Sequence, residues 1–189
     1  TVLIDPADIE VVNNNIVLAG TNFELIANNS ITVEENILIS TRNVDGSDNS
    51  VGNSGDIRLE ADHINLKNGS ELRADANSGM EGGTVTLTNL MADVDIDDLD
   101  PTSYIFGDGV LSDVIGTSNF KDIVGGDTTE EAQAFAKRLL NFDDDVSITA
   151  DGATIKGGTV NLDLYASSRF GFNKDANASI TLNDTLIEA

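Results

Sequence analysis

The densest group of side chains that could do chemistry is the acidic stretch DVDIDDLD at 93–100. In an extended segment, alternation places Asp93, Asp95 and Asp97 on one face, and Asp98 follows directly. Carboxylate oxygens are the ligands that calcium prefers in proteins, so these four aspartates are the candidate calcium ligands of the chain. The stretch lacks the glycine and the glutamate that an EF-hand loop needs at fixed positions. A solvated acidic loop therefore remains the alternative to a calcium site.

The single histidine, His63, gives no catalytic pattern. It lies at a corner between predicted strands without a serine or cysteine partner in the pattern, so we interpret it as an ordinary turn or surface residue. The absence of cysteine excludes disulfides, thiolate metal sites and cysteine nucleophiles. Glycan cleavage would need two carboxylates facing each other across a groove, and the linear sequence singles out no such pair. We expect a non-enzymatic protein, with a polysaccharide lyase or depolymerase as the alternative.

Two nearly identical hexapeptides, GGTVTL at 82–87 and GGTVNL at 157–162, could be taken for phosphate-binding glycine loops. Neither is followed by the Lys-Ser/Thr of a P-loop, and neither has G-x-G-x-x-G spacing. As corners of a repeating scaffold they make sense, because paired glycines allow a tight turn and a close backbone approach. The pair therefore predicts that the scaffold resumes in the same phase after the segment between them.

Acidic residues dominate the charge of the 189-residue chain: 33 aspartates and glutamates against 10 lysines and arginines give a net charge of -23. Nucleic acid is a poor partner, since its phosphates are bound mainly by lysine and arginine. An anionic membrane surface is disfavoured for the same reason, and no apolar run is long enough to span a membrane. The hydrophobic content of 40% indicates one folded domain over 1–189.

Short runs of alternating apolar and polar residues make up most of the chain, and each is typical of a strand with one face inward. They include NIVLAG (15–20), FELIA (23–27), SITVEE (30–35), NILIST (36–41), DIRLEA (56–61), HINLKN (63–68), ELRADA (71–76), TVTLTN (84–89), VSITAD (146–151), TVNLDLYA (159–166) and SITLND (179–184). Most links lack the Asn-Gly or Gly-Gly centres of two-residue hairpins, whereas asparagine, aspartate and glycine could supply left-handed corners. We therefore predict an all-β parallel β-helix (β-solenoid), with three strands to a coil and coils stacked on one another. An antiparallel sandwich is the alternative.

Two stretches interrupt this pattern. The Ser/Asn/Gly-rich region at 42–55 is predicted to be a loop excursion from a corner, and 90–145 is predicted to be an insertion. Within the insertion, apolar residues at helical spacing predict one amphipathic α-helix near 128–141, and Thr128 with Glu131 forms a capping box at its start. This helix could pack on the outside of the strands or serve as a lid or docking arm.

The run SGDIRLEADHINLKNGSELRADANSGMEGGTVTLTN at 54–89 closely resembles the coil repeat of filamentous-haemagglutinin-like exoproteins of the two-partner secretion pathway. In that repeat, Gly-(Asp/Asn)-Ile leads one strand, Ala-Asp leads a second, and Asn-Gly-(Ala/Ser) leads a third. The resemblance covers 1–89 and 146–189 and leaves the middle of the chain unmatched. It implies a right-handed parallel β-helix that is a portion of the stalk of an adhesin.

The resemblance also implies partners and a location. Members of this family pass through an outer-membrane transporter and are displayed on, or released from, a Gram-negative cell, where most act as adhesins. We therefore expect a secreted or cell-surface segment that attaches to a host protein, a glycan or a biofilm matrix polysaccharide. Binding of nucleic acid and insertion into a membrane are not expected. End-to-end self-association into an extracellular filament is a further alternative.

Overall fold

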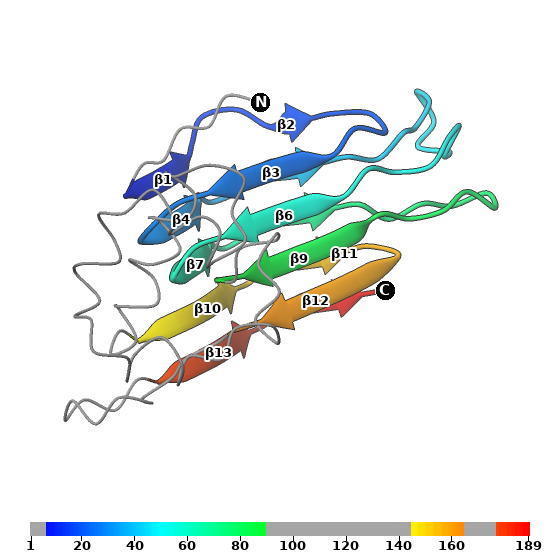
Figure 1. The fold of residues 1–189 in the computed structure, drawn as a ribbon. Helices are drawn as coiled ribbons and strands as arrows, with labels where there is room; N and C mark the ends of the chain where they lie inside the picture. Colours follow the sequence, from blue (N-terminus) through cyan, green and yellow to red (C-terminus); the bar gives the residue numbers. More distant parts are fainter. Residues whose placement is uncertain (1–6, 90–144, 165–176) are drawn as a thin grey trace, which may run out of the picture. The chain divides into compact units, whose positions relative to one another are not determined.

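A computed structural model describes residues 7–89, 145–164 and 177–189, all of which belong to one compact unit of the chain. Regular structure in these residues consists of strands alone (Figure 1). The strands are short, between two and six residues each, because each is followed by a turn that redirects the chain. The prediction of an all-β fold is confirmed for these residues, whereas the helix predicted near 128–141 lies outside them.

The strands belong to three sheets, which we name A, B and C. Sheet A contains β1 (Asp8–Val11), β4 (Ser30–Val33), β7 (His63–Leu66), β10 (Val146–Asp151) and β13 (Ala178–Asn183). Sheet B contains β2 (Ile16–Val17), β5 (Leu38–Ser40), β8 (Glu71–Arg73), β11 (Thr154–Lys156) and β14 (Leu186–Glu188). Sheet C contains β3 (Phe23–Ile26), β6 (Ile57–Glu60), β9 (Thr84–Thr88) and β12 (Thr159–Asp163). Consecutive strands visit A, B and C in turn, so three strands form one coil.

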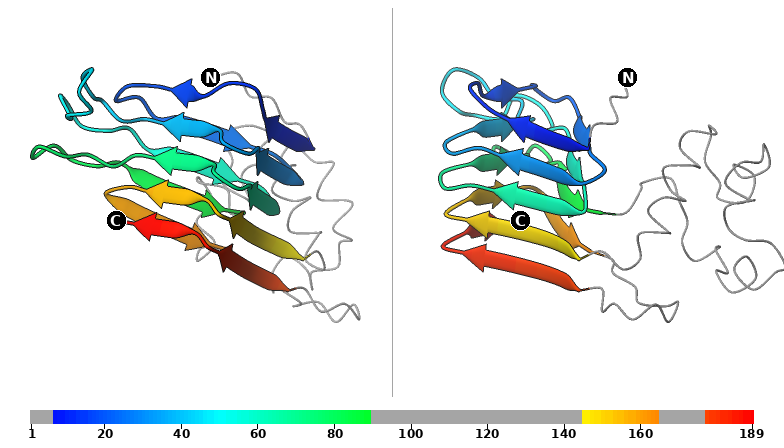
Figure 2. Two further views of the ribbon diagram at one scale, coloured as in Figure 1. Left: turned by 180° about the vertical axis from the view of Figure 1, so that it is seen from behind. Right: turned by 90° about the vertical axis from the view of Figure 1, so that its left-hand side faces the viewer.

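All pairings between these strands are parallel and join neighbouring coils. The alternative of an antiparallel sandwich is therefore wrong for the part of the chain that the structure describes. Figure 2 shows the coils stacked one on the next, an arrangement compatible with a β-solenoid. Stacked partners lie at very different sequence separations: Ser30 follows Asp8 by 22 residues, and Ser147 follows His63 by 84. The register between stacked strands is thus constant, although the number of residues from one coil to the next is not.

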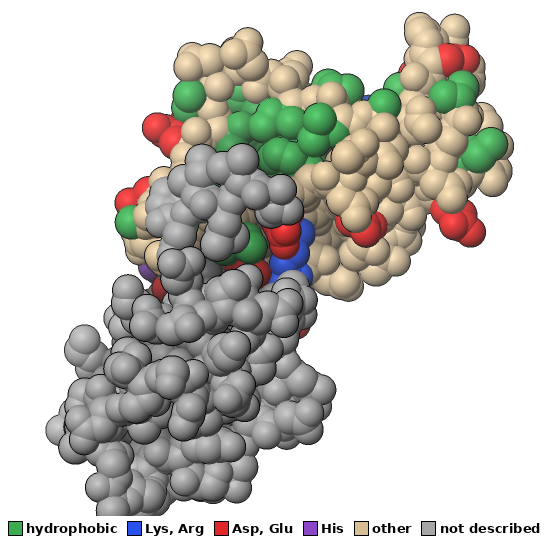
Figure 3. Space-filling model, turned by 45° about the horizontal axis from the view of Figure 1, so that its top comes forward, with side chains coloured by type: hydrophobic (Ala, Val, Ile, Leu, Met, Phe, Trp, Pro, Cys, Tyr) green, Lys and Arg blue, Asp and Glu red, His purple; other side chains and the backbone are tan. Residues whose placement is uncertain are grey.

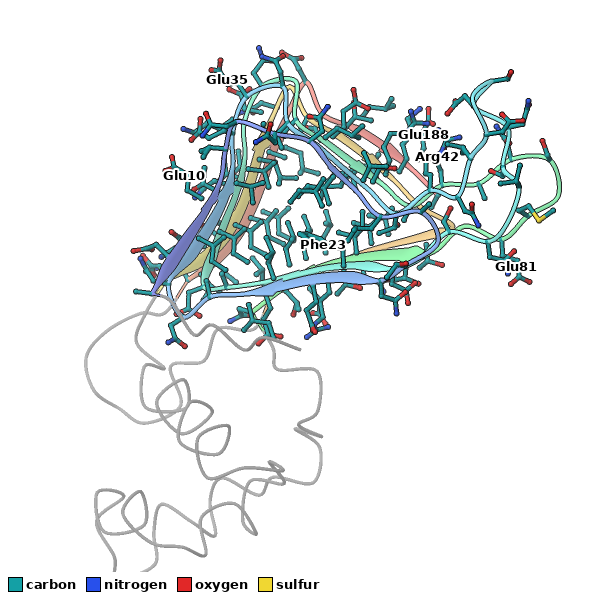
Figure 4. The ribbon with its side chains drawn as sticks, turned by 90° about the horizontal axis from the view of Figure 1, so that it is seen from above. Glu10, Phe23, Glu35, Arg42, Glu81 and Glu188 are labelled. Carbon is teal, nitrogen blue, oxygen red and sulfur yellow. The ribbon has the colours of Figure 1, made fainter. Side chains whose placement is uncertain are left out.

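The interior is built from columns of aliphatic side chains, one from each coil. Ile31, Ile64 and Ile148 stack in register in sheet A and are fully buried, as are Leu72 and Ile155 in sheet B. Burying one such side chain stabilises the fold by about 1.5–3 kcal/mol. Viewed along the stack, side chains fill the triangle that the three sheets enclose (Figure 4). This narrow interior suits isoleucine, valine and leucine, which accords with an aromatic content of only 5%.

The corner between sheets A and B, the A–B corner, holds one residue with positive φ in every coil. These residues are Asn13, Asn36, Gly69, Gly152 and Asp184, with φ between 46° and 72°. The left-handed conformation is open to glycine and tolerated by asparagine and aspartate. Corners of successive coils also touch, since the amide of Gly69 donates to the carbonyl of Gly152 at 3.0 Å. The left-handed corners predicted from the composition are therefore present.

The two Gly-Gly-Thr-Val stretches lie directly on each other. Val85 pairs with Val160 and Leu87 with Leu162, so the prediction that the scaffold resumes in phase is confirmed. A Cβ at Gly158 would lie 2.6 Å from the carbonyl oxygen of Gly82, far closer than real Cβ atoms come to backbone. The glycines permit contact between coils and are not arranged as a phosphate cradle.

Both internal gaps in the described residues fall at one corner, between sheet C and sheet A. One separates β9 from β10, and the other separates β12 from β13. The strands on either side of the first gap pair with coils in unbroken register. The described strands on the two sides of each gap therefore keep one register.

Candidate recognition surfaces

The corner between sheets B and C, the B–C corner, changes in length from coil to coil. It consists of residues 18–22 in the first coil, 41–56 in the second, 74–83 in the third and 157–158 in the fourth. Two long loops thus lie on adjacent coils between two short corners. We call residues 41–56 and 74–83 the loop pair. Figure 4 shows it extending beyond the triangle of the sheets.

Reciprocal hydrogen bonds join the two loops. The Ser50 amide donates to Asn77 Oδ1 at 2.7 Å, and the Asn77 amide donates to Ser50 Oγ at 2.9 Å. Farther along, the Glu81 amide donates to Asn53 Oδ1 at 3.1 Å, and the Ser54 amide donates to the Glu81 carbonyl at 3.0 Å. Partners advance in the same direction along both loops, so the parallel stacking of the coils continues into the loop pair.

Arg42 lies at the base of the loop pair and is only 5% exposed. Its guanidinium forms ion pairs with Asp48 of its own loop and with Asp75 of the other, and its Nε also donates to the Asp75 carbonyl at 3.3 Å. Arg73 binds the same Asp75 carboxylate at 3.0 Å. Burial raises the pKa of Asp75, but the hydrogen bond from Arg73 and the charges of Arg73 and Arg42 outweigh it and leave the pKa below 3.8. The network therefore fixes both loops around charged groups.

The first loop is also ordered internally. The Asp45 carboxylate accepts the amides of Asn49 at 3.0 Å and Ser47 at 2.8 Å, and these bonds lower the pKa of Asp45 below 3.8. Val44 and Ser50 form an antiparallel bridge across this turn. A loop with its backbone groups satisfied in this way presents its tip in a fixed shape.

Two hydrophobic side chains of the loop pair face solvent. Val51 is 58% exposed and Met80 is 41% exposed. They belong to the hydrogen-bonded stretches 50–54 and 77–81, one from each loop. Figure 3 shows hydrophobic and acidic side chains together on the projecting part of this surface. Exposed apolar side chains on a fixed loop offer contacts to a protein partner.

Only the first loop of the loop pair was predicted from the sequence. The excursion predicted at 42–55 lies between β5 and β6, but ELRADA was predicted as a strand over 71–76, whereas β8 ends at Arg73. Ala74 is fully buried, so the inward alternation continues past the end of the strand. The missed signal is the run ANSGMEGG at 76–83, whose asparagine, serine and glycine residues are typical of a turn.

The outer face of sheet A carries two rows of polar side chains, one residue from each strand. The outer row contains Asp8, Ser30, His63, Ser147 and Ser179, and the central row contains Glu10, Thr32, Asn65, Thr149 and Thr181. His63 opens a strand instead of lying in a turn, and its Nδ1 is 3.0 Å from Ser147 Oγ. The tripeptide Ser-Ile-Thr, which occurs at 30–32, 147–149 and 179–181, was the signal for these rows.

An open cavity of about 380 Å³ lies over the central row. Central-row side chains line it together with Leu66 and with acidic residues of β1, β10 and the A–B corner. Lys67 also lines the cavity and forms an ion pair with Glu34, which lowers the pKa of Glu34 and raises that of Lys67. The cavity is thus open and combines hydroxyl, amide and carboxylate groups with apolar surface.

The candidate calcium ligands Asp93, Asp95, Asp97 and Asp98 lie outside the described residues. Within residues 7–89, 145–164 and 177–189, no group of three or more histidine, aspartate or glutamate side chains is placed to hold a metal ion. The same residues contain no helix of the length and apolarity needed to cross a membrane. The calcium site therefore stays a prediction.

Comparison of the chain with models of protein families, with curated proteins and with solved structures found no match.

Proposed function

We propose that the chain is a segment of a right-handed parallel β-helix that acts as a non-enzymatic, rigid support for attachment, displayed on or secreted from a Gram-negative bacterium. The observation that carries the proposal is the loop pair, in which two interlocked loops project from coils whose interior register is constant. Recognition usually resides in loops held by a rigid scaffold. The resemblance of 54–89 to the exoprotein coil repeat supports the same role and implies secretion through an outer-membrane transporter.

The loop pair suits contact with a protein. The ion pairs of the buried Arg42 with Asp48 and Asp75 lower the conformational freedom that binding would otherwise have to remove. Its exposed Val51 and Met80 supply apolar contact area within an acidic surface. A partner that places apolar and basic side chains together would match both properties.

Bead retention tests this proposal. Fluorescent beads coated with the protein are applied to cultured epithelial cells and washed under flow, with albumin-coated beads as the reference. We expect retention above the reference and a reduction of about tenfold when Val51→Asp is combined with Met80→Glu. Val12→Asp is the matched control, because Val12 is 39% exposed but lies at the A–B corner. Retention no better than albumin would contradict the attachment role.

End-to-end association is a second candidate that a separate observation favours. The interior residues Ile180, Leu182 and Ile187 of β13 and β14 are exposed, in contrast to their stacked partners Ile148, Ala150 and Ile155. An aliphatic layer of this kind is suited to stack on a further coil, either one of the same polypeptide or one of a second copy. Sedimentation over a hundredfold range of concentration should then show association, which Ile180→Asp should abolish. A monomer at every concentration would reject this candidate.

A further inference from the structure

We propose that the outer face of sheet A binds a linear polysaccharide of neutral sugars, which lies across the strands along the central row. The inference rests on the proposed attachment role, for which it names a ligand class and a face separate from the loop pair. It follows from three properties of this face: the repeat of its polar groups, their fixed positions, and its charge.

The repeat sets the form of the ligand. Adjacent strands lie about 4.7–4.9 Å apart, so the central row presents one hydroxyl, amide or carboxylate group at each such step from Glu10 to Thr181. A ligand that meets these groups in succession must itself repeat at a similar distance. One pyranose ring of an extended glycan spans a comparable length and carries hydroxyls that both donate and accept.

The polar groups are held in place before a ligand arrives. Thr32, Asn65 and Thr149 are half-buried side chains on strands paired over their full length. The outer row lies two residues away along each strand and adds further polar groups, with His63 and Ser147 already in contact at 3.0 Å. Two parallel rows of this kind offer hydrogen bonds along both edges of a sugar chain. Pre-positioned groups lose little freedom on binding.

Charge and polarity exclude the other polymers. Glu10, Glu34, Glu35 and Asp151 border the cavity, and its one lysine, Lys67, is paired with Glu34. Nucleic acid and uronate or sulfated glycans would be repelled by this border. The two rows contain no apolar residue, which disfavours an apolar protein partner. The cavity over the central row is open, which leaves room for a chain that continues past it, and the neutral hydroxyls of a sugar can donate to its carboxylates.

Nuclear magnetic resonance titration of the whole chain tests the inference. The probes are cellopentaose, laminaripentaose and mannopentaose as neutral glycans, and pentagalacturonate as the anionic one. We expect at least one neutral pentasaccharide to shift amide resonances of β4, β7 and β10, and pentagalacturonate to leave them unchanged. Measurement of reducing ends in the same samples should show that the bound glycan is not cleaved.

Substitutions that remove hydrogen-bonding groups but keep the side-chain volume separate binding from folding. Thr149→Val combined with Asn65→Leu should weaken the binding about tenfold, which corresponds to the loss of roughly one net hydrogen bond. Thr154→Val in sheet B and Thr86→Val in sheet C are matched controls, since both residues are equally half-buried, and each should change the affinity less than twofold.

Three results would overturn the inference: no shift with any neutral pentasaccharide at millimolar concentration, shifts confined to the loop pair, or equal losses in test and control variants. These results differ from a failure of the attachment role. Beads that are retained by cells while no glycan binds sheet A would leave that role standing and remove only the glycan surface. Glycan binding without retention of beads would support the glycan surface and contradict the attachment role.

Discussion

At the A–B corner the longest link in any coil is four residues, such as 34–37, whereas the B–C corner ranges from 157–158 to 41–56. Both corners belong to the same coils and connect equally short strands. At the A–B corner a residue with positive φ sits in each coil, and backbones and side chains of successive corners touch. At the B–C corner the backbones of successive coils approach closely at Gly55 and Gly83, directly before sheet C, and the two long loops before that point are bonded to each other. The A–B corner therefore stays short in every coil, whereas at the B–C corner a loop can lengthen before the close contact at sheet C when the loop of the adjacent coil lengthens with it and bonds to it.

The largest loss of stability should come from a substitution at Gly83, where the backbones of two coils approach closely. Gly83→Ala would place a Cβ against the carbonyl oxygen of Gly55, a backbone atom with little freedom to move, and we expect a loss of about 3 kcal/mol in the free energy of unfolding. The measurement is the midpoint of urea denaturation. Gly46→Ala is the control, because a Cβ there would meet nothing within 4 Å, and its effect should stay within about 0.5 kcal/mol. Equal midpoints for the two variants would show that the contact does not limit this corner.

Removal of the Arg42 guanidinium should have the next largest effect and should be confined to the loop pair. Arg42→Ala leaves Asp75 without one of its two cations in a partly buried site, a loss of about 2 kcal/mol for hydrogen bonds to charged groups. The measurement is hydrogen exchange at the Ser50 and Asn77 amides, which should accelerate while amides of sheet A do not. Lys67→Ala is the control, since the ion pair of Lys67 with Glu34 lies at the A–B corner, and it should leave exchange at the Ser50 and Asn77 amides unchanged. Acceleration throughout all three sheets would mean that the loop pair supports the whole stack.

The contrast between the corners also explains what the sequence could predict. Alternating aliphatic residues and the two Gly-Gly-Thr-Val stretches predict stacked strands in one phase, because these patterns depend on local geometry alone. The second loop was not predicted, because the strand-like alternation continues past the end of β8. Ala74 is still buried, and Arg73 is still bonded to Asp75. The bonds that shape the loop join residues 27 and 28 positions apart, a spacing that no local pattern specifies.

The rows on sheet A were only partly accessible from the sequence. Their inward neighbours could be identified by alternation, and Ser-Ile-Thr is visible as a repeated tripeptide. The alignment of Thr32 with Thr149 could not, because the first gap lies between their coils and only the paired strands fix their register. Of the two interpretations of His63, a turn residue or a surface residue, the second agrees with its place as the first residue of β7 in the outer row of sheet A.

At the A–B corner a smaller effect is expected from the left-handed conformation. Gly69→Ala combines φ of 72° with a Cβ 2.5 Å from Asn36 Oδ1, and we expect a cost of about 1.5 kcal/mol, mostly from the conformation. The free energy of unfolding in urea is the measurement. Gly79→Ala at the B–C corner has φ of 80° but no neighbour within 4 Å, so it should cost about 1 kcal/mol. A larger cost at Gly79 than at Gly69 would contradict the view that contact between coils restricts the A–B corner.

The smallest expected effect is a loss of amide protection at low pH, which should occur at the B–C corner and not at the A–B corner. Because the pKa of Asp75 is held below its ordinary value of 3.8 in the folded protein, its carboxylate stabilises the loop pair above that pH. This contribution is lost as the pH falls below about 3.8 toward the folded pKa. Hydrogen exchange at the Asn77 amide, corrected for the intrinsic rate, should accelerate in this range. The Gly69 amide is bonded to a backbone carbonyl and should keep its protection. In Asp75→Asn the acceleration at Asn77 should be reduced, with the remainder due to Asp45, whose pKa is lowered by backbone amides of the same loop. An unchanged acceleration in that variant would assign the whole effect to Asp45 and remove Asp75 from the pH response of the loop pair.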